Sequence, residues 1–191
     1  MKSCQALLAV CVCAVLPLHA ADLSDLIYTT TDVKVTITDC KTSASGELVI
    51  PDTIEGKPVT SIGGAAFWGC ASLTSITIPD SVTSIGSGNF YGCTSLTSIT
   101  IPNSVTSIEF NAFLRCTNLT SITIPDSVTS IRLGAFGNCT SLTEVTFLGD
   151  APKEGRSLFN KSTPTIYRNP EAKGWGETWG GRPVKLISEK P

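Results

Sequence analysis

The sequence is poor in charged residues and nearly balanced in charge. Charged side chains make up 16% of the 191 residues and the net charge is -2, whereas an average globular domain has about 25% charged residues. A basic face that binds nucleic acid or an anionic membrane needs clustered lysine and arginine. The sequence therefore predicts no nucleic-acid partner, and its many serine and threonine residues predict a surface made largely of hydroxyl groups.

Long hydrophobic runs are also absent. The apolar stretch from Leu7 to Leu18 is interrupted by Pro17, and it is shorter than the roughly 20 residues that a membrane-spanning helix needs. Lys2 precedes this stretch and the small residue Ala20 follows it, which is the layout of a secretory signal. We predict that residues 1–20 are a signal peptide, and that the mature chain is secreted or displayed on the cell surface and has no transmembrane segment.

Histidine would be missing from the mature chain, because the single histidine is His19. Without histidine there is neither Ser–His nor Cys–His nucleophilic catalysis, nor a histidine-ligated metal centre. Tail carboxylates such as Glu171 and Glu177 do not have the spacing of a catalytic pair. The sequence therefore predicts a protein that is not an enzyme and that holds no metal or cofactor.

The sequence does contain a repeat of 23 residues, in which leucine, phenylalanine and cysteine recur in register. The recurring residues are Leu73, Leu96, Leu119 and Leu142; Phe67, Phe90, Phe113, Phe136 and Phe159; and Cys70, Cys93, Cys116 and Cys139. A related copy with an insertion around 55–57 precedes them, and the pattern decays after Leu142, where Ser162 replaces the cysteine. A fixed period of this length is typical of stacked repeat architectures.

The pattern within one copy predicts its geometry. Ser75–Ile78 alternates between polar and apolar residues and ends at Pro79, which predicts a short strand with its isoleucines facing inward. A second extended segment is expected over 82–85, followed by a turn over 86–93 with Phe90 inserted. One coil cannot bury its own apolar face, but coils stacked about 4.8 Å apart form a continuous core.

The pattern L-x-x-I-x-I-P-x-x-V-x-x-I-x-x-x-A-F-x-x-C resembles the BspA-type leucine-rich repeats of bacterial surface proteins. The resemblance implies a leucine-rich repeat solenoid of the α/β horseshoe class, mainly β with short helical turns. It also implies a secreted or surface-displayed module for adhesion or protein binding. We expect an N-terminal cap strand region over 21–45, leucine-rich repeats over 46–162 and a C-terminal cap over 163–191.

Candidate contact residues lie in the turns, where the copies differ most. The strand segments barely change between copies, whereas two stretches of each turn change freely. Large side chains in these stretches, with one arginine, form the predicted binding surface for a protein or glycan partner: Trp68, Tyr91, Phe110, Leu114, Arg115 and Leu133. Contiguous exposed aromatic residues are typical of contact surfaces. The alternative is that these side chains pack locally against the next coil.

The strand segments offer a different candidate surface. Their outward positions carry hydroxyl groups in register, from Ser75, Ser98 and Ser121 beside Thr77, Thr100 and Thr123. Such a lattice favours an alternative function, in which the solenoid is structural or binds glycan or ice. The simpler interpretation is a solvated face, because serine and threonine are soluble residues that strands tolerate.

Three smaller features complete the set of expectations. The cysteines of the mature chain are odd in number and are predicted to be small buried apolar residues of undetermined redox state: Cys40, Cys70, Cys93, Cys116 and Cys139. Glu109 and Arg132 occupy equivalent positions of adjacent copies and are expected to form a surface ion pair. Asn118, Asn138 and Asn160 match the N-glycosylation pattern, and the sequence leaves open whether they are used.

Overall fold

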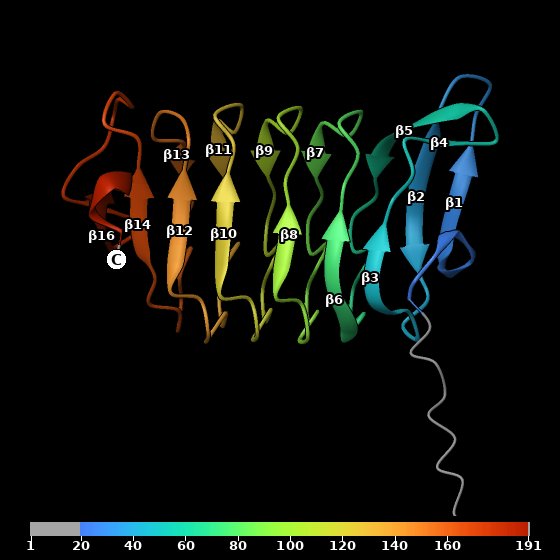
Figure 1. Cartoon of the computed structure of the whole chain (residues 1–191), viewed down its shortest axis with the longest axis horizontal. Coiled ribbons are helices and arrows are strands. Elements are labelled where there is room, and N and C mark those ends of the chain that lie inside the picture. Colours follow the sequence, from blue (N-terminus) through green and yellow to red (C-terminus); the bar gives the residue numbers. More distant parts are fainter. Residues whose placement is uncertain (1–19, 191) are drawn as a thin grey trace, which may run out of the picture.

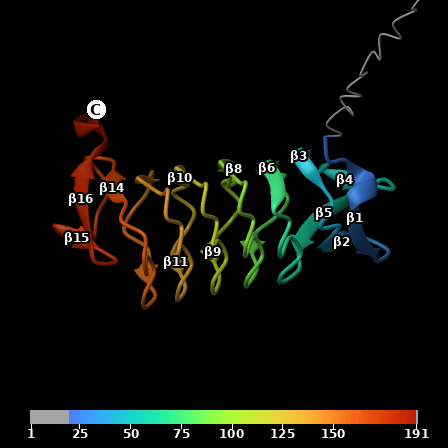
Figure 2. The ribbon, with the colours of Figure 1, turned by 90° about the horizontal axis from the view of Figure 1, so that it is seen from below.

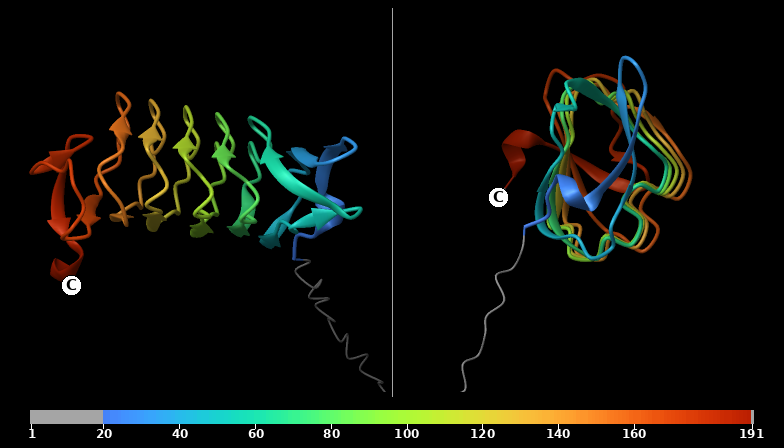
Figure 3. Two further views of the ribbon diagram at one scale, coloured as in Figure 1. Left: turned by 90° about the horizontal axis from the view of Figure 1, so that it is seen from above. Right: turned by 90° about the vertical axis from the view of Figure 1, so that its right-hand side faces the viewer.

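The protein is a row of stacked coils (Figure 1), described here for residues 20–190 of a computed structural model. The predicted signal segment lies outside these residues apart from Ala20. Seen along the stack, the central coils superpose on one another (Figure 3, right). The predicted solenoid with a 23-residue repeat is confirmed.

Each central coil has a strand in a front row and a short strand in a back row. The front strands are β3 (Ser45–Val49), β6 (Ser72–Thr77), β8 (Ser98–Thr100), β10 (Ser121–Ile124), β12 (Glu144–Phe147), β14 (Thr165–Arg168) and β16 (Arg182–Leu186). The back strands are β7 (Ser84–Ile85), β9 (Ser107–Ile108), β11 (Ser130–Ile131) and β13 (Lys153–Glu154). The front strands that pair do so in parallel, and the back row forms the parallel sheet β13-β11-β9-β7.

The core lies between the two rows and is built from columns of identical side chains. Leu73, Ile76 and Ile78 are buried, as the alternation predicts. The phenylalanines form a ladder through the centre, in which consecutive ring centroids are 5.2 to 5.6 Å apart and the rings are within 16° of parallel. Because each coil supplies the same side chain at the same height, every ring finds a partner on both sides except at the ends.

The two ends of the stack are closed differently (Figure 2). The N-terminal end has η1 (Leu23–Asp25) and a sheet of order β1-β2-β5-β4, made from β1 (Leu26–Thr30), β2 (Val35–Cys40), β4 (Thr53–Ile54) and β5 (Lys57–Ile62). The C-terminal end has β15 (Thr178–Trp179), paired antiparallel with β16, and η2 (Ile187–Glu189). The rings of Trp175 and Trp179 each lie 4.9 Å from the Phe147 ring and cover the last core residues.

The turns between a back strand and the next front strand, called outer turns below, contain no helix in the described residues. The short helical turns implied by the resemblance are replaced by two left-handed residues in each coil. One column is Ala65, Gly88, Asn111, Gly134 and Ser157, and the other, four residues on, is Gly69, Gly92, Arg115, Asn138 and Lys161. A residue with positive φ breaks a right-handed helix, so the outer turns cannot become helical.

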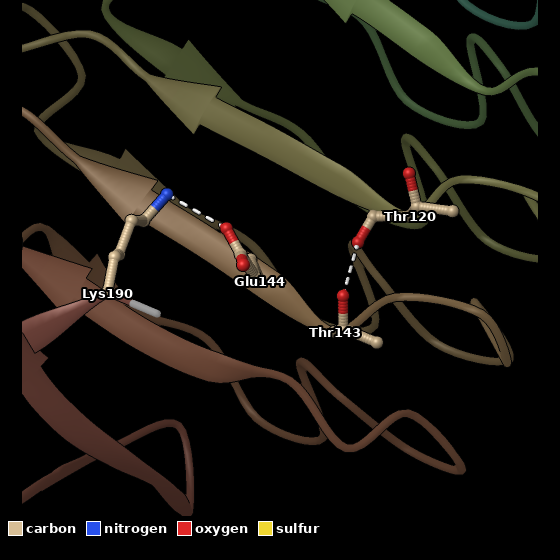
Figure 4. A network of polar contacts seen from close by, with 4 residues as sticks. All are labelled: Thr120, Thr143, Glu144 and Lys190. Carbon is tan, nitrogen blue, oxygen red and sulfur yellow. Dashed lines mark hydrogen bonds and ion pairs between the residues drawn. The ribbon is translucent and has the colours of Figure 1, made fainter.

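Many hydroxyl groups tie one coil to the one before it. Ser81, Ser104 and Ser127 donate through Oγ to the carbonyl oxygens of Val59, Val82 and Val105. Threonine hydroxyls do the same along the front row, as in the 3.1 Å bond from Thr143 Oγ1 to the Thr120 carbonyl oxygen (Figure 4). Serine and threonine are therefore abundant because they bond neighbouring coils together as well as because they form the surface.

Removing one of these hydroxyls has a predictable effect on stability. Ser104→Ala should lower the free energy of unfolding by about 1 kcal/mol, because the carbonyl of Val82 loses its partner from the next coil. Ser98→Ala is the matched control, since that hydroxyl is exposed and makes no hydrogen bond within residues 20–190; its effect should stay below about 0.5 kcal/mol. Urea unfolding followed by circular dichroism measures both variants. Equal losses of stability would contradict the role of the Ser104 hydroxyl in joining two coils.

The front row is interrupted at one place. Among residues 20–190, no ladder of hydrogen bonds joins β8 to β10, so the front strands form two sheets. Figure 1 shows a wider gap between these two strands than between their neighbours. The coils stay joined elsewhere, as by the 2.9 Å bond from Gly92 N to Leu114 O in the outer turn. The interruption, called the seam below, is therefore confined to the front face.

Candidate binding surface

The outer turns bring four of the predicted contact residues together. The ring centroids of Trp68 and Tyr91 lie 4.5 Å apart with a tilt of 31°. The guanidinium carbon of Arg115 lies 5.7 Å from the Tyr91 ring centroid, within cation–π range. Leu114 follows Tyr91 in the same column. This set of Trp68, Tyr91, Leu114 and Arg115 is called the aromatic ridge below.

Burial differs along the aromatic ridge. The side chain of Trp68 is 56% exposed, whereas Tyr91 and Leu114 are half-buried. Leu114 packs over Gly137 of the next coil, since a Cβ on that glycine would lie only 2.8 Å from Leu114 Cδ1. Leu114 therefore packs against the next coil, as the alternative interpretation expected, while Trp68 is largely exposed to solvent.

The remaining two predicted contact residues form a second group. Phe110 and Leu133 occupy equivalent positions of adjacent coils and are 47% and 44% exposed. Arg132 covers one face of the Phe110 ring, with its guanidinium carbon 5.8 Å from the ring centroid. The Nε of Arg132 also lies 3.8 Å from Glu109 Oε2, which confirms the predicted ion pair. Within residues 20–190 no ring contact joins Phe110 to the Trp68–Tyr91 pair.

Backbone conformation accounts for part of the variation between copies. Arg115 has φ of 65°, and the equivalent residues Gly69 and Gly92 have φ of 72° and 73°. Positive φ favours glycine and asparagine, so glycine in these columns follows from the turn and gives no sign of a ligand. Arg115 and Lys161 are the exceptions in this column, because each is an exposed residue whose left-handed backbone conformation costs energy.

The strand face is less regular than its sequence indicates. The seam lies between Thr100 and Thr123 and opens a shallow pocket of about 250 Å³ lined by both strands. The serine column also ends early, because its fourth position is Glu144, whose Oε2 lies 2.8 Å from Lys190 Nζ of the C-terminal segment (Figure 4). The hydroxyl lattice is therefore interrupted at the seam, and it ends at the ion pair between Glu144 and Lys190.

The cysteines within residues 20–190 are buried, as predicted. The thiols of Cys93, Cys116 and Cys139 donate to the carbonyl oxygens of Phe67, Phe90 and Phe113 over 3.0 to 3.1 Å. Burial raises the pKa of both Cys93 and Cys139 to about 12. Ser162, at the same position of the last copy, makes the same bond to Phe136 over 2.7 Å. Among the described residues no cluster of His, Cys, Asp or Glu has the arrangement of a metal site.

The repeat region matches a known family model. Six copies of the BspA type leucine rich repeat cover residues 46–166. The chain belongs to the BspA-type leucine-rich repeat family. No curated protein shows significant similarity to the chain.

Solved structures of bacterial leucine-rich repeat proteins resemble this BspA-type chain. A T. pallidum leucine-rich repeat protein is 30% identical, with a TM-score of 0.67 over 78% of this chain and 71% of its own. A leucine-rich repeat protein from Bacteroides capillosus is 32% identical, with a TM-score of 0.55 over 64% of this chain and 94% of its own.

A third relative is longer. It is a leucine rich cell surface protein from Faecalibacterium prausnitzii, 31% identical, with a TM-score of 0.59 over 78% of this chain. The chain spans 44% of the length of that protein. In the part of the present chain that the structure describes, no helix is long and apolar enough to cross a membrane.

Proposed function

We propose that this BspA-type chain is a secreted or surface-displayed module that binds a protein partner through its outer turns. The observation that carries the proposal is the exposure of Trp68, a large aromatic side chain that is 56% exposed. Exposed aromatic residues beside an arginine are the composition that dominates binding energies in protein interfaces. The aromatic ridge is therefore the proposed centre of contact.

Preorganisation supports this assignment. The backbone of each outer turn is bonded to the next, as in the bonds from Gly69 N to Tyr91 O and from Gly92 N to Leu114 O. Stacking on Tyr91 also restricts the Trp68 ring. Side chains that are already ordered lose little entropy when a partner binds.

Charge supports a partner with an exposed carboxylate near an apolar patch. Arg115 is exposed and makes no ion pair with any of residues 20–190. Arg132, in contrast, is already engaged by Glu109. Arg115 is therefore the residue on the ridge that is available to pair with an acidic group of the partner.

Localisation at the cell surface or in the medium is part of the same proposal. The predicted signal over residues 1–20 supports export, and the relative from Faecalibacterium prausnitzii is a cell surface protein. An adhesion role fits a module that carries its contact residues on a rigid stack.

The alternative function through the hydroxyl lattice has weaker support. A structural, ice-binding or glycan-binding role needs evenly spaced rungs, and the seam separates the rungs of Ser98 and Ser121. Glu144 and Lys190 occupy the next rung. The strand face therefore serves as the comparison surface in the experiment that follows.

Mutation of the two surfaces separates these functions. Surface proteins from bacterial and host cells are captured on the immobilised chain, and the captured protein is identified and purified for calorimetry. Trp68→Ala and Tyr91→Ala should each weaken its binding by about 1 to 3 kcal/mol. The matched strand-face variants Ser98→Ala and Thr100→Ala should change binding by less than about 0.5 kcal/mol.

Two controls make the result interpretable. Circular dichroism must show that each variant keeps the wild-type spectrum and melting temperature, because a misfolded variant loses affinity for a trivial reason. A parallel glycan array tests the other ligand class. Binding that is lost only in Ser98→Ala and Thr100→Ala, or a glycan ligand insensitive to Trp68→Ala, would contradict the proposed contact surface.

A further inference from the structure

The first repeat thiol differs from all the later ones. Cys93, Cys116 and Cys139 each donate to a phenylalanine carbonyl 26 residues earlier, over 3.1, 3.1 and 3.0 Å. Cys70 has no phenylalanine turn before it, because the cap precedes it. Its Sγ lies 3.8 Å from the carbonyl oxygens of both Cys40 and Lys41, which are long contacts for a thiol.

A second thiol lies at this position. Cys40, the last residue of β2 in the cap, places its Sγ 3.7 Å from the Lys41 carbonyl oxygen, the atom that Cys70 also contacts. The Sγ of Cys70 also contacts the backbone of Cys40 itself, 3.8 Å from its carbonyl oxygen. Both side chains are buried. The two sulfurs therefore lie against the same carbonyl oxygen, and they come from segments 30 residues apart in the chain, one in the cap and one in the first coil.

We propose that Cys40 and Cys70 form a disulfide that fastens the N-terminal cap to the repeat stack. Cys93, Cys116 and Cys139 stay reduced, because each of them is held by a carbonyl of the preceding coil. The pairing does not depend on the proposed binding function. Export would only determine the compartment in which the thiols encounter the oxidant.

The chemistry is a thiol–disulfide exchange with a small disulfide such as oxidised glutathione. The Cys70 thiolate attacks one sulfur of the oxidant, so that a mixed disulfide forms and one glutathione leaves as a thiolate. The Cys40 sulfur, after losing its proton to that thiolate, then attacks Cys70 Sγ and releases the second glutathione. Two protein thiols are oxidised, and one glutathione disulfide is reduced to two glutathione molecules.

The exchange can equally begin at Cys40, because both thiols are accessible to the oxidant while the cap is open. Because both sulfurs are buried in the folded protein, the oxidant reaches them while the cap is open, and the test is therefore made during refolding.

Peptide mapping provides the direct test. The whole chain is unfolded, reduced, refolded with a mixture of reduced and oxidised glutathione, unfolded again and alkylated. Trypsin with chymotrypsin separates Cys70 from Cys93, which a tryptic digest alone would leave on one peptide because no lysine or arginine lies between them. We expect the Cys40 and Cys70 peptides to be linked and to lack two hydrogen atoms, and Cys93, Cys116 and Cys139 to be alkylated.

Substitution tests the contribution of the bond to stability. Closing a loop of this length should raise the melting temperature by roughly 5 to 10 °C, so Cys40→Ser and Cys70→Ser should each melt that much below the oxidised wild type. Serine is tolerated in the column of Cys70, since Ser162 occupies the equivalent site in the last copy. Cys93→Ser is the matched control and should keep the Cys40–Cys70 link.

A comparison under reducing conditions distinguishes a disulfide between Cys40 and Cys70 from two thiols that only pack together. The melting difference between wild type and Cys70→Ser should disappear when both are kept in reducing agent throughout refolding. A difference that persists there, or alkylation of Cys40 and Cys70 to the same extent as Cys93 after oxidative refolding, would overturn the proposal. So would a link from either residue to any other cysteine.

Discussion

Phe113→Ala should lower the free energy of unfolding by about 3 to 5 kcal/mol. The ring is fully buried, and it stacks between Phe90 at 5.2 Å and Phe136 at 5.4 Å. The substitution therefore leaves a cavity in the middle of the stack and removes two ring contacts at once. Because stability in a repeat protein depends on interfaces between neighbouring coils, both interfaces of this coil are weakened.

The matched control for this prediction is Phe110→Ala, three residues earlier in the same outer turn. Phe110 is 47% exposed and packs mainly against Arg132, so its loss should cost less than about 1 kcal/mol. Urea unfolding monitored by far-ultraviolet circular dichroism gives both values. A Phe113→Ala variant as stable as the wild type would show that the ladder is not the core of the coil.

The repeat itself explains why the fold could be predicted from the sequence. The alternation in Ser75–Ile78 and the recurrence of Phe90 every 23 residues specify inward positions, and these residues are buried as expected. Each coil tests the same prediction again, so an error in one copy would conflict with the others. The ion pair between Glu109 and Arg132 followed from the same logic, because stacked coils place equivalent residues side by side.

Other features could not be predicted because they depend on backbone geometry or on contacts that do not recur from coil to coil. The left-handed conformation at Arg115 is hidden in the sequence, because glycine and asparagine signal positive φ and arginine does not. The seam between β8 and β10 lies between two copies with nearly identical strands. The pairing of Lys190 with Glu144 joins a tail segment to a distant strand. For the candidate surface, the sequence predicted the columns and left open whether their side chains pack against the next coil, as Leu114 does over Gly137.

A buried polar residue marks one position where the sequence departs from its own repeat. Asn89 is fully buried, and neither its Nδ2 nor its Oδ1 has a hydrogen-bond partner. The equivalent residues of neighbouring coils are Ala66, Ala112 and Ala135, all buried, and the last copy has Leu158. The backbone of this position therefore accepts an apolar side chain without change.

Asn89→Ala should consequently raise the free energy of unfolding by about 1 to 2 kcal/mol. The substitution removes two polar atoms that are dehydrated without compensation, a cost of about 1 to 3 kcal/mol for each buried group, and part of this gain is offset by the small void that alanine leaves. Urea unfolding of the variant beside the wild type measures the change. A destabilisation would mean that the amide makes a bond in solution, with a buried water as the partner that such a site can hold.

Asn89→Leu distinguishes the polar effect from the filling of space. Leucine occupies the same position in the last copy, as buried Leu158, so a gain in both variants attributes the stabilisation to removal of the amide. A gain in Asn89→Leu alone attributes it to filled volume. Because Asn89 lies two residues before Tyr91 in the same outer turn, unchanged partner binding in Asn89→Ala would further show that the amide is not required to position the aromatic ridge.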